Sequence, residues 1–534
     1  MHSLLRKLWS KYKVEYILLL VMNIVNTCIE TFNVFLEGML INSLVYKAER
    51  ETFVRTIIAI VVLNIGRLVL SFFINKIQIL KYKKIHLNFN DLLVKKLYSK
   101  NTLKIIKKDA VQTADRITED TSEILTFLFY TINQAISIVF STFIILFYIF
   151  NSSSQFLWLI IILLPAYTGL YLFLRPKIFE INLKLKQVYN DYFSAFTEWL
   201  SRYIEIKGNR REDLENKRWN QTKIRLLDIT RRDFWLNLNL SNGKIILQLI
   251  FQLILFINGG LVVIAGGMTI GAFSILFQYF NQLLNQVDEI FSVLLGYESF
   301  RVAKLRLDNL LSIKDEIDGK IILSKIKSIK VDAFDIFLNQ KKPLFSKKLN
   351  CTFINPGFYI LKGKNGIGKS TFIRTLIGLY TPFTEGKILI NGINLDQINK
   401  KKMRTNNISC LFQDIPLPNC LVSEYIGNMH HENDIAKDES FKKVFYSSQF
   451  SINKVLNRKM DELSTGEIQL VKLYSAIIKS EVDCLLLDEP LANIYPELQR
   501  DVLDLLKYIA KNKLVIVISH DVHFEGTNNV VKVG

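Results

Sequence analysis

The sequence contains a stretch with the residue types of a phosphate-binding loop, Gly363-Lys364-Asn365-Gly366-Ile367-Gly368-Lys369-Ser370-Thr371. It follows an apolar segment of strand character, FYIL, and precedes a segment of helix character, TFIRTLIGLY. The spacing matches GxxxxGK[ST], in which glycines let backbone N–H groups turn toward phosphate oxygens and the helix start adds positive charge. We therefore expect Lys369 to contact the β- and γ-phosphates of a nucleotide and the Ser370 hydroxyl to ligate Mg²⁺.

A second candidate site lies at the end of the apolar segment Cys484–Leu487, which is followed by two carboxylates, Asp488 and Glu489. Asp488 suits the surroundings of Mg²⁺, and Glu489 suits the polarisation of a water that attacks the γ-phosphate. Many strands end in acidic residues, so the pair alone is a moderate signal for a catalytic site. Its position downstream of the phosphate-binding loop makes the signal strong. Together the two motifs predict hydrolysis of a nucleoside triphosphate.

These motifs need a scaffold of alternating strands and helices, and the sequence has that pattern after Leu311. The strand-like segments are Ser328–Val331, Phe358–Leu361, Lys387–Ile390, Ile408–Phe412, Cys484–Leu487 and Leu514–Ile518. Their alternation with helical stretches predicts an α/β domain with a largely parallel sheet. We place this ATP-binding domain at residues 313–534.

The composition of the whole chain points to a membrane. Of its 534 residues, 50% are hydrophobic, yet the formal net charge is +19, which suits a nucleic-acid binder or a membrane protein and excludes a disordered chain. Apolar runs decide between the two, and they span residues 16–45, 52–74, 124–150, 156–173, 245–264 and, more weakly, 270–295. A bilayer core needs roughly 20 apolar residues of helix. We therefore expect a domain of six transmembrane helices at residues 1–312 and no nucleic-acid partner.

The loop charges set the orientation of these helices. The stretches 76–108 and 175–232 are rich in lysine and arginine, whereas the loops 151–155 and 266–272 carry no charge. Basic loops stay on the cytoplasmic side during insertion. We expect both termini, both basic stretches and the ATP-binding domain in the cytoplasm.

Between the two nucleotide motifs, Leu463-Ser464-Thr465-Gly466-Glu467 resembles the LSGGQ signature of the ATP-binding-cassette (ABC) family. Gln413 resembles the family's Q-loop glutamine, which touches Mg²⁺ and the attacking water, and His520 resembles its switch histidine. The resemblance implies the cofactors ATP and Mg²⁺, with Glu489, His520 and Gln413 as catalytic residues. It implies ATP binding by residues 363–371 and Asp488, Mg²⁺ at Ser370 and Gln413, and Asp488 in the second shell of the metal. Ser464, Thr465, Gly466 and Glu467 would contact ATP held by a partner cassette.

The same resemblance implies a dimer, because the chain has one membrane half and one cassette. A homodimer is our expectation, and a heterodimer with a related half-transporter is the alternative. Two departures from the family pattern bear on this choice. Tyr495 stands where the D-loop has Asp, and Ile336 stands where an aromatic residue stacks on adenine, with Phe334 or Phe337 as substitutes.

The membrane half resembles the exporter type of this family. Arg116–Asp120 is similar to the start of the third long helix, Glu198–Lys207 to the second coupling helix, and Ala303–Leu307 to the end of the sixth. The LSTG form of the signature resembles exporters of small cyclic or lasso-type peptides. These likenesses imply a bacterial plasma-membrane exporter.

Charged residues inside the apolar runs are candidates for a substrate cavity, because such residues are costly in a bilayer. They are Glu30, Glu37, Arg67, Asp288 and Glu289. If the acids line the cavity, a cationic or amphipathic peptide suits it, and if Arg67 pairs with Glu30 or Glu37, the charges are structural. The alternatives are a lipid or multidrug exporter and, in another class, a non-transporting membrane regulator or ATP-gated channel.

Overall fold

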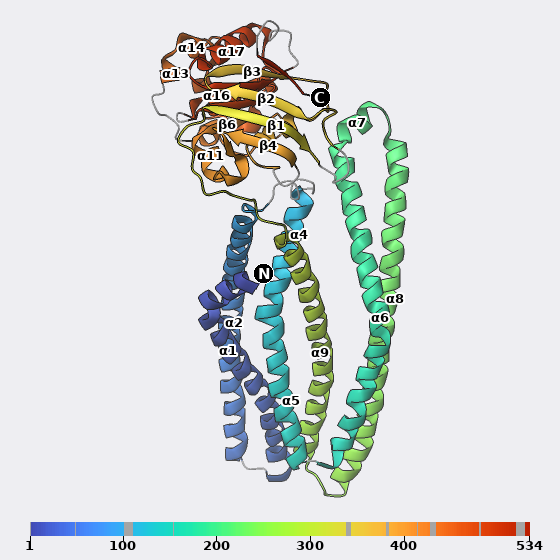
Figure 1. Cartoon of the computed structure of the whole chain (residues 1–534). Helices are drawn as coiled ribbons and strands as arrows, with labels where there is room; N and C mark the ends of the chain where they lie inside the picture. Colours follow the sequence, from blue (N-terminus) through green and yellow to red (C-terminus); the bar gives the residue numbers. More distant parts are fainter. Residues whose placement is uncertain are drawn as a thin grey trace. The chain divides into compact units, whose positions relative to one another are not determined.

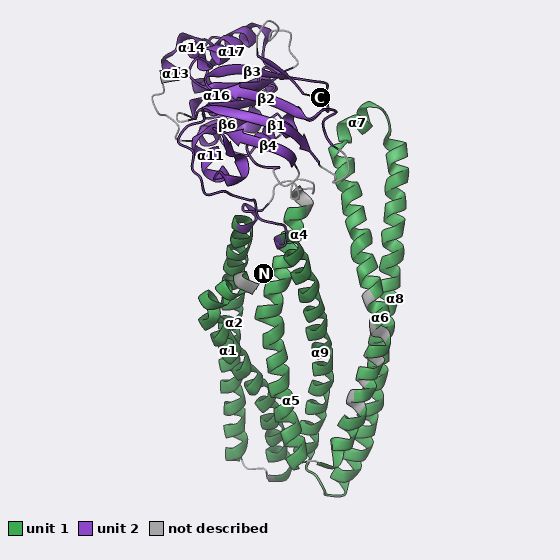
Figure 2. Cartoon of the chain, viewed as in Figure 1, with its two compact units in different colours: residues 1–95, 113–310 green, residues 96–112, 311–534 purple. Residues whose placement is uncertain are grey.

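A computed structural model describes residues 2–47, 50–100, 110–152, 154–337, 343–380, 384–413, 415–427, 434–479, 482–519 and 529–533. The chain divides into two compact units (Figure 2). Unit 1 comprises residues 1–95 and 113–310, and unit 2 comprises residues 96–112 and 311–534.

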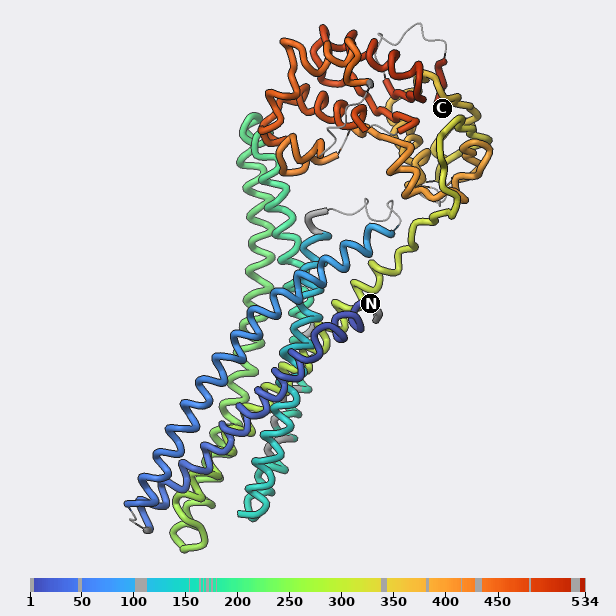
Figure 3. Tube along the Cα trace, turned by 90° about the vertical axis from the view of Figure 1, so that its left-hand side faces the viewer, coloured from blue at the N-terminus to red at the C-terminus, as the bar shows by residue number. Residues whose placement is uncertain are grey.

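Unit 1 consists of helices, most of them long (Figure 1). They are α1 (His2–Asn42), α2 (Arg50–Leu97), α4 (Ala110–Thr126), α5 (Ile132–Ser152), α6 (Leu157–Ser201), α7 (Tyr203–Gly208), α8 (Glu212–Ile264) and α9 (Ile270–Leu311). A π-helical segment, Phe127–Thr131, joins α4 to α5, so that the two form one rod (Figure 3). Helix α8 has 53 residues, which at 1.5 Å per residue is about 80 Å and far exceeds a bilayer core of ~30 Å.

The six apolar runs expected from the sequence lie in these helices and in the short helical segments Ser43–Lys47, Phe127–Thr131 and Ser154–Phe156 that adjoin them. In the part of the chain that the structure describes, four helical stretches are long and apolar enough to cross a membrane by length and composition. They are Leu4–Tyr46, Arg50–Leu97, Thr113–Ser152 and Glu212–Ile264.

Small residues let two helices of unit 1 approach closely. A Cβ atom added to Gly271 of α9 would lie 2.1 Å from the carbonyl oxygen of Gly38 in α1. The Gly271 N–H donates a 2.9 Å hydrogen bond to Asn42 Oδ1. Without a hydrophobic driving force between helices in lipid, such close packing and hydrogen bonding hold them together.

Unit 2 has a five-stranded sheet in which every pairing is parallel, in the order β6-β7-β8-β3-β9. Its strands are β3 (Gly357–Lys362), β6 (Ile408–Leu411), β7 (Cys484–Asp488), β8 (Leu514–Ile518) and β9 (Val530–Lys532). Every residue of β7 and β8 is buried, which explains why their sequences, CLLLD and LVIVI, are apolar runs without alternation. The predicted parallel sheet is confirmed.

A second sheet in unit 2 is antiparallel, a feature that the sequence analysis did not separate from the first. It has the order β2-β1-β4-β5, with β1 at Ser328–Ile336, β2 at Leu349–Ile354, β4 at Thr384–Ile390 and β5 at Ile393–Asn394. Gly386 has φ +79°, and a Cβ atom there would lie 2.3 Å from the Ala333 carbonyl oxygen. This glycine therefore allows β4 to cross the bulged part of β1.

Helices complete unit 2, namely α10 (Lys369–Leu376), α11 (Lys400–Asn406), α12 (Val422–Ile426), α13 (Asp434–Lys437), α14 (Glu439–Phe445), α15 (Ile452–Val455), α16 (Thr465–Ile478) and α17 (Pro496–Ile509). Helices α14, α16 and α17 pack apolar side chains such as Phe441, Leu470 and Leu506 into one core with β7 and β8.

The segment that follows α9 is held to unit 2 by its acidic residues. Asp315 forms an ion pair with Lys100 at 2.9 Å. The Glu316 carboxylate accepts hydrogen bonds from Nη1 and Nη2 of Arg404, at 2.6 and 2.9 Å. Asp318 Oδ1 accepts a 2.6 Å hydrogen bond from the Lys400 backbone. The carbonyl oxygen of Ile317 accepts a hydrogen bond from Lys400 Nζ. Each of the four residues 315–318 therefore has a polar contact with the rest of unit 2.

Candidate functional site

The phosphate-binding loop connects β3 to α10 at the carboxyl end of the parallel sheet. Gly366 and Gly368 have φ values of +77° and +101°, a region that residues with a side chain rarely adopt. At Gly368, the residue before α10, an added Cβ atom would also lie 2.3 Å from the Leu344 side chain. The fold therefore requires glycine at this position, as the motif predicts.

Lys369 is buried at the start of α10 and folds back over the loop. Its Nζ donates hydrogen bonds to the carbonyl oxygens of Gly363 at 2.9 Å and Lys364 at 3.1 Å. Burial lowers the pKa of Lys369, and the nearby carboxylates of Glu489 and Asp488 oppose that shift. The ammonium group thus lies among loop carbonyls and facing carboxylates, where a polyphosphate would offer it stronger partners.

A cavity of about 440 Å³ lies beside the loop. Its lining residues are Lys362 from β3, Lys364 from the loop and Lys532 from β9, together with Ser346, Gly363, Ile367 and Val533. The register pairs Lys362 with Lys532 on neighbouring strands. Three lysine residues along one cavity bring positive charge to this region, which suits a polyanionic ligand.

Asp488 and Glu489 lie two strands from the loop. Asp488, the last residue of β7, is 2% exposed, and both Asp488 and Leu361 of β3 face Ile518 of the intervening strand β8. Two strand spacings place the two strands about 10 Å apart. The carboxyl ends of parallel strands meet at one edge of a sheet, which is why distant sequence motifs converge here.

Glu489 is held in an unusual backbone conformation, with φ +48°. Its N–H bonds to Ile518 O at 2.9 Å, and its carbonyl oxygen accepts a 3.0 Å hydrogen bond from Gln469 Nε2 of α16. Its carboxylate accepts a 2.7 Å hydrogen bond from Gln413 Nε2. A left-handed conformation in a residue other than glycine is typical of functional sites, where neighbours enforce it.

The structure therefore brings together Lys369, Gln413, Asp488 and Glu489. Gln469, which helps to fix Glu489, was missed in the sequence analysis, although its place five residues after Ser464 on the signature helix is a usable signal. His520 lies outside the described residues. Ser519, just before it, is 4% exposed.

The signature residues form the first turn of α16. Ser464 is the N-cap, and its Oγ accepts a 3.3 Å hydrogen bond from the Glu467 N–H while Glu467 Oε2 accepts a 2.8 Å bond from the Ser464 N–H. A Cβ atom on Gly466 would lie 2.7 Å from the Asn493 carbonyl oxygen, so this glycine allows the D-loop to pack on the helix start. Tyr495, in that loop, is 51% exposed.

The two aromatic substitutes for an adenine-stacking residue differ in availability. Ile336 is fully buried, and Phe334 is 1% exposed in the core, where its ring centroid lies 6.0 Å from that of Phe372. Neither can stack on a nucleotide without unfolding β1. Phe337 is half-buried and remains the candidate.

Three of the charged residues expected within the membrane, Glu30, Arg67 and Asp288, have ionic partners. Arg67 of α2 pairs with Glu30 of α1 at 2.7 Å, which is the structural interpretation that the sequence left open. Asp288 of α9 pairs with Lys244 of α8. Lys244 was not singled out, although it directly precedes an apolar run. Glu37 and Glu289 are exposed residues on α1 and α9, and Gln134 of α5 forms a hydrogen bond with the Glu289 side chain.

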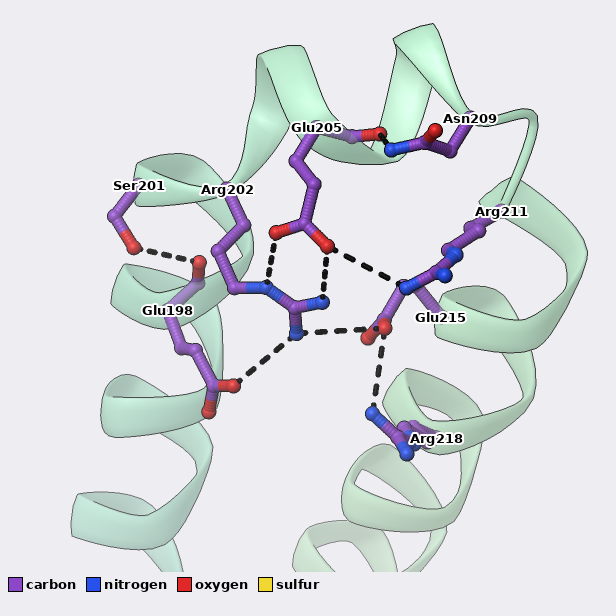
Figure 4. A network of polar contacts seen from close by, with 8 residues as sticks. All are labelled: Glu198, Ser201, Arg202, Glu205, Asn209, Arg211, Glu215 and Arg218. Carbon is purple, nitrogen blue, oxygen red and sulfur yellow. Dashed lines mark hydrogen bonds and ion pairs between the residues drawn. The ribbon is translucent and has the colours of Figure 1, made fainter.

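A network of charges occupies the turn from α6 through α7 to α8 (Figure 4). Arg202 lies at its centre, with ion pairs to Glu205 at 3.0 Å, Glu198 at 3.4 Å and Glu215 at 3.5 Å. Arg211 and Arg218 extend it through Glu205 and Glu215. Ile204, on the short helix α7, is 86% exposed. This turn covers the segment that resembles a coupling helix.

The phosphate-binding loop and the two carboxylates meet at the carboxyl edge of the parallel sheet in unit 2, and unit 1 consists mostly of long apolar helices. Together these features are typical of a membrane-bound P-loop ATPase. The family model for the ABC transporter transmembrane region matches residues 16–287, and the model for the ABC transporter matches residues 347–492. The first match covers more than half of the chain, so the chain belongs to the ABC transporter family, whose ATP hydrolysis is coupled to transport across a membrane.

Similar proteins support this assignment. The chain is 26% identical over 535 residues to the subtilin transport ATP-binding protein SpaT of Bacillus subtilis, covering 93% of this chain and 83% of that protein. It is 31% identical over 188 residues to the energy-coupling factor transporter ATP-binding protein EcfA of Onion yellows phytoplasma, covering 35% of this chain and 68% of that protein.

Among solved structures, a bacterial Atm1-family ABC exporter with ATP bound superimposes with a TM-score of 0.82 at 15% identity, covering 98% of this chain and 94% of that one. This likeness shows the fold, an exporter-type helical region followed by an α/β ATP-binding domain. The expected fold class and the resemblance to ABC half-transporters are confirmed. The chain is a multi-pass membrane protein.

Proposed function

We propose that this chain is one half of a homodimeric exporter that uses ATP hydrolysis to move a peptide out of a bacterial cell. The observation that carries the proposal is the similarity to SpaT along 93% of the chain, because that protein is named for the transport of subtilin, a peptide. The proposed boundary between its membrane and ATP-binding domains lies at residues 312 and 313, with the ATP-binding domain in the cytoplasm.

The proposed reaction is hydrolysis of the bond between the β- and γ-phosphates of ATP. Lys369 and the N–H groups of the loop hold the phosphates, and Glu489 polarises a water that attacks the γ-phosphate, with ADP as the leaving group. Gln413, hydrogen-bonded to the Glu489 carboxylate, keeps that group directed toward the water. His520 contacts the γ-phosphate, and the signature residues of the second chain close the site from the other side.

The residues at this site fit Mg²⁺. Ser370, Asp488 and Gln413 offer hydroxyl, carboxylate and amide oxygen atoms, the ligand type that this ion prefers. Over the described parts of the chain, no group of three or more His, Cys, Asp and Glu side chains could hold a metal by itself. Mg²⁺ binds typically through one or two protein oxygens plus the phosphates of the substrate. The ion would supply charge neutralisation of the β- and γ-phosphates.

The charges of unit 1 favour a cationic cargo. The ion pairs of Arg67 with Glu30 and of Lys244 with Asp288 neutralise both of those cations. Glu37 and Glu289, which are exposed residues of α1 and α9, then add negative charge to these helices. An ionisable residue at membrane depth costs free energy, so such residues commonly mark functional sites. These two glutamates are therefore the proposed contacts for basic residues of a peptide.

The test of the catalytic assignment is the ATPase rate of the purified full-length protein carrying Glu489→Gln. A general base contributes roughly 10²- to 10⁴-fold to a rate, so hydrolysis should fall by about that factor while ATP binding persists. Glu497→Gln, an exposed acid at the start of α17, is the matched control and should hydrolyse ATP like the wild type. A Glu489→Gln protein with the wild-type rate would refute the assignment.

A further inference from the structure

The first turn of α16 carries a carboxylate at the place where it should meet phosphate. Glu467 lies in that turn, and its Oε2 is fixed by the 2.8 Å hydrogen bond from the Ser464 N–H. A helix N-terminus carries about half a positive charge, which attracts anions. A full negative charge on Glu467 more than cancels that attraction and would repel the γ-phosphate of an approaching nucleotide.

The structure supplies a compensating cation, Arg458, from the loop ahead of the signature. Its Nη1 lies 3.4 Å from Glu467 Oε1. This is the carboxylate oxygen that does not accept the hydrogen bond from the Ser464 N–H. Its Nη2 donates a 2.5 Å hydrogen bond to the Glu462 carbonyl oxygen. Glu467 is therefore held at one oxygen by its own helix start and at the other by a guanidinium group.

The backbone of Arg458 is fixed as well, and this places the start of its side chain beside the signature. Its N–H donates to Val455 O at 2.9 Å, and its carbonyl oxygen accepts from Val422 N at 2.9 Å. The side chains of Arg458 and Glu467 are 42% and 26% exposed. The pair thus lies at the surface of unit 2 beside Ser464, where a second chain can approach.

We propose that Arg458 is a positioning residue of the signature: it neutralises Glu467 so that Ser464 and Gly466 can receive the γ-phosphate of ATP bound to the partner chain. With Arg458 in place, the first turn of α16 keeps its net positive character. This inference rests on the proposed function, because it assumes a composite site between two chains.

The test is a double-mutant cycle on the ATPase of the full-length protein. Arg458→Gln should raise the KM for ATP or lower kcat/KM by about tenfold, the effect of one charge-assisted interaction. In a Glu467→Gln background, the same Arg458→Gln change should cost less than twofold, because no carboxylate remains to be neutralised. Arg500→Gln, which removes an exposed arginine of α17, controls for the loss of surface charge.

A merely structural role of Arg458 predicts the opposite pattern. Its bond to Glu462 O is lost in either background, so the change would then cost the same with and without Glu467. An equal cost in both backgrounds, or no cost in the wild type, would overturn the proposal. As a second readout, Glu489→Gln protein should retain bound ATP after rapid dilution, and adding Arg458→Gln should shorten that retention. Failure of the proposed function shows separately, as an ATPase insensitive to Glu489→Gln.

Discussion

Removing the Arg404 guanidinium should leave a buried carboxylate in unit 2 without its ionic partner. Arg404 donates through Nη1 and Nη2 to the two oxygens of Glu316 at 2.6 and 2.9 Å, and through Nη1 to Ile377 O at 3.0 Å. The side chains of Arg404 and Glu316 are 24% and 9% exposed. An Arg404→Leu change would therefore strand the Glu316 charge and detach the segment that follows α9 from α11.

The expected cost follows from that burial. Breaking a buried ion pair by removing one partner costs about 3–5 kcal/mol, and we reduce this to about 2–3 kcal/mol because a quarter of Arg404 is solvated. In a domain of this size, 1 kcal/mol shifts the midpoint of thermal unfolding by about 2–4 °C. The Arg404→Leu protein should thus unfold about 4–12 °C below the wild type. Arg404→Lys keeps the positive charge but loses the two-point hydrogen bond to Glu316. Its unfolding midpoint should lie between those of the wild type and Arg404→Leu.

The assay is thermal unfolding of the purified full-length protein at one fixed heating rate. Lys443→Gln is the matched control, because Lys443 pairs with Glu439 at 3.3 Å while both side chains stay more than half exposed. Such an exposed pair contributes about 0.3–0.5 kcal/mol, or roughly 2 °C at most. If Arg404→Leu shifted the midpoint no more than Lys443→Gln does, the reasoning about buried charge would be wrong.

Three further changes test the ATP site and the charged turn. Lys369→Ala should abolish ATP binding, measured by equilibrium titration, because the phosphates lose their buried ammonium partner; unchanged affinity would contradict its placement. Chelation of divalent metal should stop hydrolysis and spare nucleotide binding, with recovery on adding Mg²⁺; continued hydrolysis in the chelator would exclude a metal requirement. Arg202→Gln removes the centre of the charged network (Figure 4) and should lower peptide transport more than ATPase. Arg218→Gln, at the network's edge, should affect transport less, and equal effects of the two changes would contradict the central role of Arg202.

Much of the ATP site could be predicted from the sequence because its residues follow strands in fixed local patterns. The phosphate-binding loop needs glycine at Gly366 and Gly368 for backbone reasons that act within a few residues. Asp488 ends an apolar strand buried on both faces, and such a run is visible without a structure. The long apolar helices of unit 1 were predictable for a similar reason, since apolar length alone signals them.

Other features depend on contacts between elements and leave no local pattern. The ion pair of Lys244 with Asp288 joins residues 44 positions apart, and the Gln469 bond to the Glu489 carbonyl depends on how α16 packs beside β7. The antiparallel pairing of β1 with β4 is likewise decided by tertiary packing, since the two strands have apolar patterns that suit either direction. The burial of Phe334, and with it the choice of Phe337 as the remaining aromatic, also required the structure.

Uptake into vesicles tests the proposed ATP-driven transport of a cationic peptide by two copies of this chain. The purified protein is reconstituted so that the ATP-binding unit faces outward, and accumulation of a labelled basic peptide is measured against a neutral peptide of equal length. We expect accumulation of the basic peptide that requires ATP, is lost with Glu489→Gln and is weakened by Glu37→Gln. Equal accumulation of both peptides, or accumulation that persists without ATP hydrolysis, would contradict it.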